Sequence, residues 1–387
     1  MKISILAPDL SNNCLGRAYL LAKILQRHYE VEIVGPIFGE GIWEPVASDV
    51  GIAYKSVKIC GKFKPYFQIM KLLNKIDGDV IYASKPLFTS FGIGLLKKVF
   101  KKKPLILDID DWQEGFRREG YSNLSFLTRL KFLVSSALYF YNIGSYWNSL
   151  ISERLINFSD GITVSNAFLK ERFDGTIIYH GRDVETFNPE KFNKNLIREK
   201  HKIERSKKVV MFFGSPKQHK GIEDLIDAIR LIKNKDIVLF FVGIEESQYC
   251  HYLIKVAKNK LKERFRGFGL QPFEKVPEFL TMADIIVIPQ RKNFATIGQL
   301  PAKVFDAMAM AKPIIATNVS DLPKVLEGCG WIVESENPEQ LAETIKYVLN
   351  DSEEVKDKGR KAREKCKAIY NWEAMEKILI NIFRKYE

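Results

Sequence analysis

The sequence contains little of what builds disulfide frameworks or cysteine-rich metal sites. Five cysteines are spread over 387 residues. No two of them have the spacing of a zinc site or a redox pair, so we expect free thiols in a reducing compartment. They are Cys14, Cys60, Cys250, Cys329 and Cys366.

Long apolar runs are also missing. The nearest candidate for a membrane span, Phe132–Ser152, has no charged residue but contains several serines and asparagines, which makes it a poor spanning helix. Met1–Ala7 is too short for a signal peptide and is followed by Pro8 and Asp9, so it fits a first strand. We therefore expect a cytoplasmic protein.

Two further absences limit the function. The chain has no G-x-G-x-x-G fingerprint, which argues against a nicotinamide or flavin enzyme. Its formal net charge of +13 suits nucleic acid, anionic lipid headgroups or diphosphate substrates, and charge alone does not choose among them. Because no nucleic-acid-binding motif accompanies the charge, we do not expect a nucleic-acid partner.

What the sequence does have is a repeated alternation of short apolar runs and helical patterns. We expect strands at 2–7, 30–34, 79–83, 105–109, 161–164 and 176–179, and helices at 16–27 and 86–100. After a charged stretch at about 188–208, we expect strands at 208–214, 237–242, 264–268 and 283–289, and helices at 221–233, 247–261 and 276–282. This alternation predicts an α/β protein built from doubly wound parallel sheets.

The length suggests two domains of similar size. We place them at 1–181 and 182–368, and expect residues 369–387 to form a helix that packs back on the first domain. Ligands in such sheets bind outside the carboxyl ends of the strands. We therefore expect the site in a cleft between the two domains.

The most informative segment runs from Gln299 to Thr317. A loop leads into a short helix that carries Asp306 directly before Ala-Met-Ala, Pro313 stops the helix, and a buried strand follows. This order places a helix N-terminus at the carboxyl end of a parallel sheet, where unpaired N–H groups hold anions.

The segment resembles the donor-site signature of GT-B glycosyltransferases of the retaining family four type, the glycosyl transferases group 1. The resemblance covers most of the chain and is strongest over Val209–Val333. It implies the GT-B fold, with two Rossmann-like domains facing a cleft, and a nucleotide-sugar donor held by the second domain. It also implies no metal and no cofactor, because the nucleotide sugar is a co-substrate.

Met211–Gly221 resembles the family's strand, glycine and Lys-Gly entry into a helix. The departing nucleoside diphosphate gains negative charge in the transition state, so a cation is needed there. Lys220 is our candidate for this catalytic role, against the alternative of a solvated lysine. The family's arginine after the glycine is Ser215 here, and Lys217 is a candidate replacement.

The family also carries two carboxylates eight positions apart. The second is Asp306, which we expect to accept hydrogen bonds from ribose hydroxyls. The first falls on Gly298, so the usual contact to the sugar is absent. Lys303, in the first helical turn, is either a ligand of a bound anion or a surface lysine. The loop Gly267–Leu270 would lie near the nucleobase.

The full set of donor-binding residues that the resemblance implies is Gly16, Arg17, Gly214, Ser215, Lys217, His219, Phe268, Gly298, Gln299, Leu300, Pro301, Lys303 and Asp306.

In the first domain, the strand Leu105–Ile109 leads into Asp110 and Asp111. The family often has a histidine or an acid near this point, so these aspartates are candidates to bind or deprotonate the acceptor hydroxyl. A divalent metal on the acids is the weaker alternative. His180 and Gly181 match the family's turn between the domains, where we expect a hinge.

Residues 129–155 place aliphatic and aromatic side chains at near-helical spacing, and Arg129, Lys131 and Lys101–Lys103 add positive charge. This region is either an amphipathic element that lies on anionic lipid or a helix pair packed on the domain core. The first alternative would place the protein peripherally on the inner face of the cell membrane and favour a lipid-linked acceptor.

We therefore expect a nucleotide-sugar-dependent glycosyltransferase of hexosyltransferase type. Its acceptor would be a glycan or glycolipid in cell-envelope polysaccharide or glycoconjugate synthesis. Two alternatives stay open. Because Ser215 and Gly298 replace two family residues, the chain is also compatible with a non-catalytic nucleotide-sugar-binding relative. The other alternative is a sugar-nucleotide epimerase of the same fold, which needs no acceptor.

Overall fold

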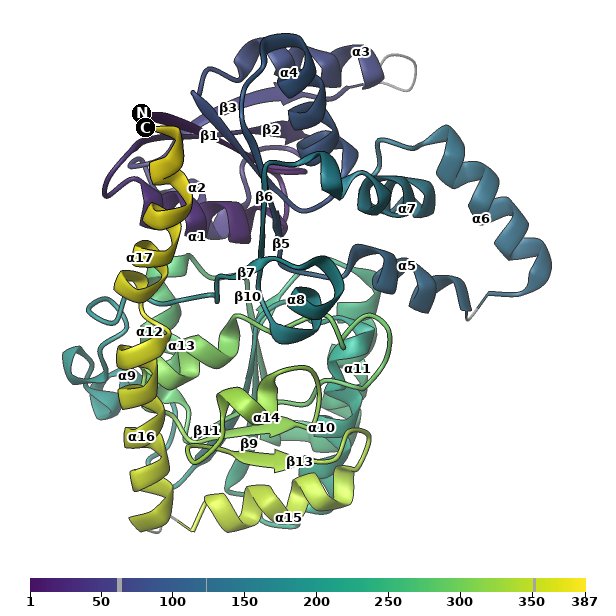
Figure 1. The fold of residues 1–387 in the computed structure, drawn as a ribbon. Coiled ribbons are helices and arrows are strands. Elements are labelled where there is room, and N and C mark those ends of the chain that lie inside the picture. The colour runs from purple at the N-terminus through teal and green to yellow at the C-terminus, as the bar shows by residue number, and fades with distance from the viewer. Residues whose placement is uncertain (61–64, 123, 351–352) are drawn as a thin grey trace. The chain divides into compact units, whose positions relative to one another are not determined.

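The computed structural model of the protein describes residues 1–60, 65–122, 124–350 and 353–387. The chain forms two compact units. The first unit comprises Met1–His180, Ile297–Leu300 and Met375–Glu387, and the second comprises Gly181–Thr296 and Pro301–Ala374. Figure 1 shows the ribbon with its elements labelled.

The first unit is built on a parallel sheet with the strand order β3-β2-β1-β4-β5-β6-β7. Its inner strands are apolar and buried, as expected for a sheet covered on both faces. The strands are β1 (Lys2–Leu6), β2 (Glu30–Ile37), β3 (Ala53–Lys58), β4 (Val80–Ser84), β5 (Leu105–Ile109), β6 (Gly161–Val164) and β7 (Thr176–Ile177).

The helices of the first unit are α1 (Leu15–Leu25), α2 (Glu44–Ala47), α3 (Pro65–Met70), α4 (Ile93–Lys101), α5 (Gln113–Ser122), α6 (Phe126–Leu138), α7 (Tyr146–Arg154) and α8 (Ala167–Phe173). The helix predicted over 86–100 is confirmed, with a first π-helical turn, Phe88–Gly92, that continues directly into α4. At this turn the Ser90 hydroxyl donates to the Lys85 carbonyl at 2.9 Å.

The second unit contains a parallel sheet with the order β10-β9-β8-β11-β12-β13. Its strands are β8 (Lys208–Phe213), β9 (Ile237–Ile244), β10 (Phe265–Gly269), β11 (Ile285–Ile288), β12 (Ile314–Thr317) and β13 (Trp331–Val333). Its helices are α9 (Lys194–Lys200), α10 (Ile222–Leu231), α11 (Gln248–Leu261), α12 (Val276–Met282), α13 (Lys303–Ala309), α14 (Leu322–Val325), α15 (Pro338–Val348) and α16 (Glu353–Ile369).

Side-chain caps fix several helix starts. The hydroxyl of Ser247 accepts the Cys250 N–H at 3.2 Å and begins α11. The hydroxyl of Ser145 accepts the Asn148 N–H at 3.1 Å and begins α7. These bonds satisfy N–H groups that have no partner within the first turn of the helix.

Both sheets reverse strand order at their first strand, so that β1 and β4 flank one switch point and β8 and β11 flank the other. Loops that leave the carboxyl ends of these strands form the usual ligand crevice of an open α/β sheet. In the first unit the loop after β4 begins with Lys85, and in the second unit the loop after β8 begins with Gly214.

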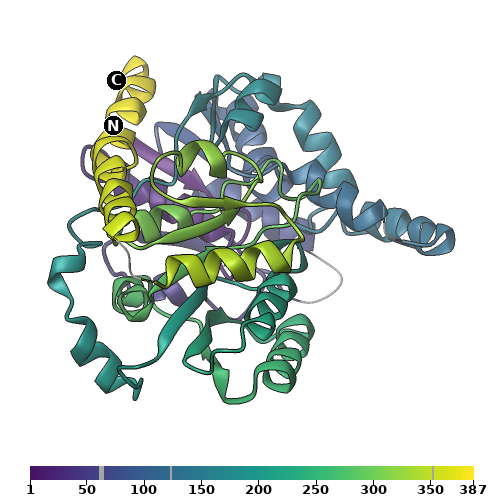
Figure 2. The same cartoon turned by 90° about the horizontal axis from the view of Figure 1, so that it is seen from below.

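The last helix, α17 (Trp372–Phe383), belongs to the first unit from Met375 onward. Its Phe383 is fully buried, with its ring centroid 5.3 Å from that of Tyr82. Tyr29 donates a hydrogen bond to Glu387 at 2.9 Å. The two chain ends lie side by side in Figures 1 and 2. Among the described residues, no helix is both long and apolar enough to cross a membrane.

Candidate functional site

The loop after β8 requires glycine at two points. Gly214 has a φ of +109° and Gly243 a φ of +102°, a region that side chains with a Cβ rarely adopt. A Cβ on Gly243 would also stand 3.0 Å from the Gly214 backbone. The chain therefore passes very close to the end of β9 here and leaves the backbone of Gly214 without a side chain in front of it.

The predicted cations of this loop have different partners. Lys217 is ion-paired with Glu245 at 2.9 Å, and the hydroxyl of Ser215 donates to the other oxygen of the same carboxylate. Lys220 donates instead to the Ser215 carbonyl at 2.9 Å, an uncharged partner. Glu245 therefore neutralises Lys217, whereas Lys220 bonds to the loop backbone. No local pattern in the sequence pointed to Glu245.

Lys303 lies at the start of α13, buried behind the Gly214 loop. Its Nζ is 3.9 Å from the centre of the Phe212 ring, and a Cβ on Gly214 would be 3.1 Å from the same nitrogen. Among the residues that the structure describes, none accepts a hydrogen bond from this ammonium group. Burial, and next the nearby Lys220, hold the pKa of Lys303 well below its ordinary value.

Asp306 is also in α13, and Arg182 holds it in a buried ion pair. Arg182 further donates to the Ala302 carbonyl at 3.3 Å, and its backbone N–H bonds the Tyr370 carbonyl at 2.8 Å. The carboxylate predicted to hold ribose hydroxyls is thus already oriented by an arginine, and its ribose contact stays a prediction. Sequence reasoning missed Arg182, although it directly follows the predicted hinge glycine, Gly181.

The region predicted to lie near the nucleobase differs from a plain loop. Gly267, Phe268 and Gly269 belong to β10, so the strand predicted at 264–268 is confirmed with one more residue at its end, and of the segment 267–270 only Leu270 lies outside it. Phe268 is half-buried, and the Arg266 guanidinium lies 4.9 Å from its ring centre.

In the first unit, Lys85 brings the two predicted aspartates together. Its Nζ lies 2.6 Å from a carboxylate oxygen of Asp110 and 2.6 Å from one of Asp111. Lys85 follows β4 and the aspartates follow β5, so adjacent strand ends place all three side chains. The backbone of Lys85 has a φ of +68°, a strained conformation that occurs often at functional sites.

Burial determines the protonation of this cluster. It raises the pKa of Asp110 to about 6, against the opposing positive charge of Lys85. Burial also disfavours the Lys85 ammonium, but the two aspartates outweigh this and raise the pKa of Lys85 above its ordinary value. Asp110 therefore titrates in the range where a carboxylate can accept a proton near neutral pH.

Three predicted donor residues, Gly298, Gln299 and Leu300, belong to the first unit. Gln299 donates from Nε2 to Asp111 at 2.9 Å, and Asn166 donates to the Gly298 carbonyl at 3.2 Å. A Cβ on Gly298 would stand 2.5 Å from the Trp112 Cβ. The missing family carboxylate thus has a steric reason, because there is no room for a side chain at 298.

Arg17 has partners within the first unit. Its guanidinium is buried and forms a double hydrogen bond with Asp108, at 2.9 and 2.8 Å, and it also donates to the Ile178 carbonyl at 2.9 Å. These bonds tie α1 to β5 and to the residue after β7, and the contact of Arg17 with the donor stays a prediction. Gly16 lies beside the Trp43 ring.

The remaining predicted residues are described by their burial and their backbone hydrogen bonds. His180 is buried at the end of the first unit, and Gly181 begins the second. His219 lies in a 3₁₀ turn, Gln218–Lys220, and its carbonyl accepts the Arg291 N–H at 3.0 Å. Pro301 is buried two residues before α13. Within the described residues, no three His, Cys, Asp or Glu side chains are placed to hold a metal ion.

Comparison with known proteins agrees with these features. Residues 193–365 match the family described as glycosyl transferases group 1. Spore coat protein SA of Bacillus subtilis is 29% identical over 250 residues, which is 60% of this chain and 65% of that protein. N-acetyl-alpha-D-glucosaminyl L-malate synthase of Bacillus anthracis is 24% identical over 57% of this chain and 58% of that protein. The chain thus spans about three-fifths of the length of these curated relatives.

The fold has close counterparts among solved structures. The crystal structure of HepE from Anabaena in complex with UDP-glucose superposes with a TM-score of 0.78 over 100% of both chains, at 16% identity. Sucrose-phosphate synthase from Thermosynechococcus elongatus gives a TM-score of 0.76 at 16% identity, over 100% of this chain and 98% of that one. These likenesses identify the fold.

Proposed function

Because the chain has the GT-B fold and carries a glycosyl transferases group 1 domain over residues 193–365, we propose that it is a nucleotide-sugar-dependent glycosyltransferase. The second unit binds the diphosphate of the donor, and the first unit binds the acceptor. The reaction retains the anomeric configuration of the sugar. A uridine diphosphate sugar is the first donor to test, since HepE was solved with UDP-glucose.

The arrangement of Lys220 and Lys303 behind Gly214 carries this proposal. Two lysine side chains at the switch point of one sheet repel each other, and Lys303 has no hydrogen-bond acceptor within the described part of the chain. A diphosphate in front of Gly214 supplies that acceptor and compensates both charges. During transfer, Lys220 stabilises the negative charge that develops on the leaving diphosphate.

Asp110 and Asp111 take the acceptor side of the reaction. Both carboxylates are held by Lys85, and Gln299 fixes the orientation of Asp111. A carboxylate held in this way accepts a hydrogen bond from the acceptor hydroxyl and directs its oxygen for attack. The acceptor is a glycan or a lipid-linked saccharide in cell-envelope synthesis.

Substitution of Lys220 tests the assignment. Lys220→Ala should lower kcat by about 100-fold or more, the effect of losing one charged stabilising group. Lys217→Ala is the matched control from the same loop, and it should lower kcat by no more than about threefold because Glu245 neutralises Lys217. The measurement is UDP release from a panel of UDP-sugars in the presence of oligosaccharide and glycolipid extracts. Near-normal turnover by Lys220→Ala would remove Lys220 from the mechanism.

The neutralised Lys217 also favours a second candidate function. With Ser215 and Lys217 both bound to Glu245, the loop has fewer cations than the family pattern implies. A non-catalytic nucleotide-sugar-binding protein needs less stabilisation of a leaving group. Tight UDP-sugar binding without transfer or hydrolysis across the whole panel would select this alternative.

The helix α6 supports peripheral attachment to an anionic membrane. Five of its apolar side chains are at least half exposed, namely Phe126, Leu127, Leu130, Val134 and Leu138. The partner helix α7 is instead largely buried, and Figures 1 and 2 show α6 extending away from the sheet of the first unit. An apolar face beside Arg129 and Lys131 suits the boundary between lipid headgroups and acyl chains.

A further inference from the structure

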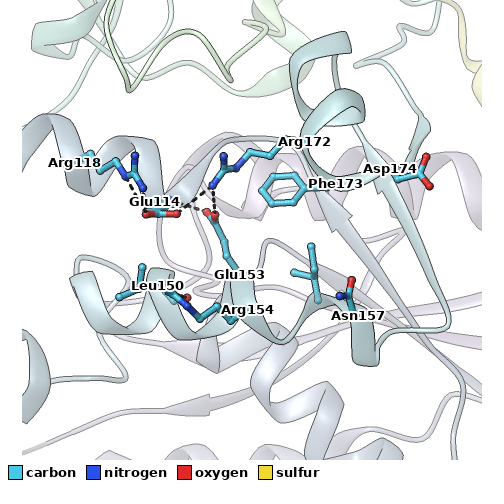
Figure 3. A pocket seen from close by; sticks show the side chains of 10 residues that line it. Glu114, Arg118, Leu150, Glu153, Arg154, Asn157, Arg172, Phe173 and Asp174 are labelled. Atoms are coloured by element: carbon cyan, nitrogen blue, oxygen red, sulfur yellow. Dashed lines mark hydrogen bonds and ion pairs between the residues drawn. The ribbon is translucent and has the colours of Figure 1, made fainter.

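A cavity of about 630 Å³ lies in the first unit, between α5, α7 and the end of α8. Figure 3 shows that acidic and basic side chains from all three helices meet there. The volume is in the range of cavities that hold small ligands. Neither the proposed donor-binding lysines, Lys220 and Lys303, nor Asp110 and Asp111 line this cavity. The cavity is therefore separate from the residues to which the proposed reaction is assigned.

Two buried acids form one wall of the cavity. Glu114, from the first turn of α5, accepts two hydrogen bonds from Arg118, at 2.9 and 2.7 Å, and one from Arg172 at 3.2 Å. Glu153, from α7, accepts the Glu114 N–H at 2.7 Å through Oε1. These hydrogen bonds and ion pairs hold both carboxyl groups in position, as Figure 3 shows.

The second carboxylate oxygen of Glu153, Oε2, can accept a hydrogen bond from a ligand. Glu153 is only 8% exposed, and Oε2 has the Arg172 guanidinium at 3.7 Å, while a hydrogen bond from the Trp112 side chain partly offsets the effect of burial on the pKa of Glu153. Burial raises the pKa of Glu153 to about 7, so near neutral pH this carboxyl both donates and accepts protons. A carboxylate oxygen has two lone pairs, so Oε2 can still accept a hydrogen bond from a ligand.

The charges around the cavity select the chemistry of that ligand. Arg118, Arg154 and Arg172 line the cavity together with Glu114, Glu153 and Asp174, so its positive and negative charges balance and favour neither an anion nor a cation. A hydroxyl group can donate to Glu153 Oε2 and accept from Arg172 at the same time. Guanidinium and carboxyl groups at the rim, together with the Phe173 ring, suit the alternating polar edges and apolar faces of a sugar.

The cavity is also joined to the acceptor aspartates through Trp112. This residue directly follows Asp111, and the Arg172 guanidinium lies 4.5 Å from its ring centre. Since Arg172 contacts both the Trp112 ring and Glu114, it links the cavity wall to the segment that holds Asp110 and Asp111. A ligand in the cavity is therefore held by the same part of the chain as the proposed acceptor hydroxyl.

We propose that this cavity is a subsite for an uncharged sugar unit of the acceptor, whose hydroxyl groups are bound by Glu153 and Arg172. The identity of the ligand as an acceptor rests on the proposed function, whereas the binding of an uncharged saccharide does not. The subsite recognises a unit of the acceptor other than the one that receives the new sugar.

The experiment is saturation-transfer difference NMR on the full chain with a panel of neutral methyl glycosides and short oligosaccharides. We expect at least one neutral saccharide to bind the unaltered protein. Asn157→Trp should weaken this binding by about tenfold or more, because Asn157 is an exposed residue of the cavity wall and a bulky side chain there fills the cavity without disturbing the core. Asn157→Ala, the matched control, should bind within about threefold of the unaltered protein.

A second pair of variants tests Glu153 itself. Glu153→Ala should lose saccharide binding, and Glu153→Gln, which keeps both hydrogen-bonding functions, should restore most of it. Equal binding by the unaltered protein and Asn157→Trp would overturn the proposal, as would the absence of binding by every saccharide. Displacement of the saccharide by inorganic phosphate would assign the cavity to an anion instead.

Measuring UDP binding on the same samples separates this inference from the proposed function. Saccharide binding without UDP binding would contradict the proposed glycosyltransferase but leave the subsite in place. UDP binding without saccharide binding would contradict only the subsite.

Discussion

Lys85 and Lys303 are both buried lysines, but their surroundings differ in charge. Two aspartates surround Lys85, which therefore keeps its proton. Lys303 faces an aromatic ring and another lysine, and its proton is held weakly. The positive charge of Lys85 is therefore compensated within the folded protein. That of Lys303 is compensated only when an anion binds beside it.

Replacing Lys303 should therefore separate stability from donor binding. Because the pKa of Lys303 is lowered in the folded state, its contribution to stability is fully present only above the ordinary lysine pKa and is lost as pH falls. At pH 7, Lys303→Met should raise the melting temperature and weaken UDP binding by about tenfold, the loss of one charged hydrogen bond. Differential scanning calorimetry and isothermal titration calorimetry measure the two effects.

Lys312→Met is the matched control, since Lys312 is half-buried and donates to the Thr281 and Ala283 carbonyls, at 3.2 and 3.0 Å. It should destabilise the protein and leave UDP affinity unchanged. Equal UDP affinity in Lys303→Met and the unaltered protein would show that Lys303 does not contact the diphosphate.

The ionisation of Asp110 should make kcat/KM depend on pH in a defined direction. It must be ionised to accept a hydrogen bond from the acceptor hydroxyl, so kcat/KM should fall as pH drops through about 6. Lys85→Met removes the opposing positive charge and should move this limb to higher pH. A profile whose acid limb stays in place in Lys85→Met would assign the limb to another group.

At the scale of single elements, α6 differs from its neighbours. Its apolar residues are exposed and continue onto Tyr139, whereas α7 packs inward through Asn148, Ser149 and Ser152. The spacing of residues 129–155 allowed both a membrane-facing and a packed helix. In the structure, α6 exposes its apolar side chains and α7 packs inward, with the turn at 139–145 between them, and lipid contact by α6 stays a prediction.

Charged substitutions on α6 test its contact with lipid. The double variant Val134→Glu, Leu138→Glu should reduce sedimentation with vesicles of 70:30 phosphatidylcholine and phosphatidylglycerol by about fivefold or more. Leu196→Glu, at a similarly exposed leucine in α9, should have no effect. Vesicle binding that is weak in the unaltered protein, or equal in the double variant, would contradict a membrane role for α6.

The predicted and observed helices and strands show which structural features have a local pattern in the sequence. α12 was predicted with the bounds that it has, because its apolar spacing and the following strand are local patterns. β3 was missed, since alternating lysine, serine and apolar residues at a sheet edge resemble a loop. The crowding at Gly298 depends on Trp112 and Phe168, and the ion pair of Asp306 on Arg182, so neither contact has a local signal.

At the scale of the whole molecule, the first unit is completed by α17. Phe383→Ala should lower the free energy of unfolding of this unit by about 3–4 kcal/mol, the usual cost of removing a buried aromatic ring. Lys377→Ala, on the exposed side of the same helix, should change it by less than about 0.5 kcal/mol. Urea unfolding followed by tryptophan fluorescence measures both changes.

The packing of α17 also affects the order of events during synthesis. A ribosome synthesises β1 well before α17, although both belong to the same compact unit. Domains usually fold as they emerge, but this one cannot bury Tyr82 against Phe383 until α17 has been made. The core of the first unit therefore stays incomplete while the second unit is synthesised.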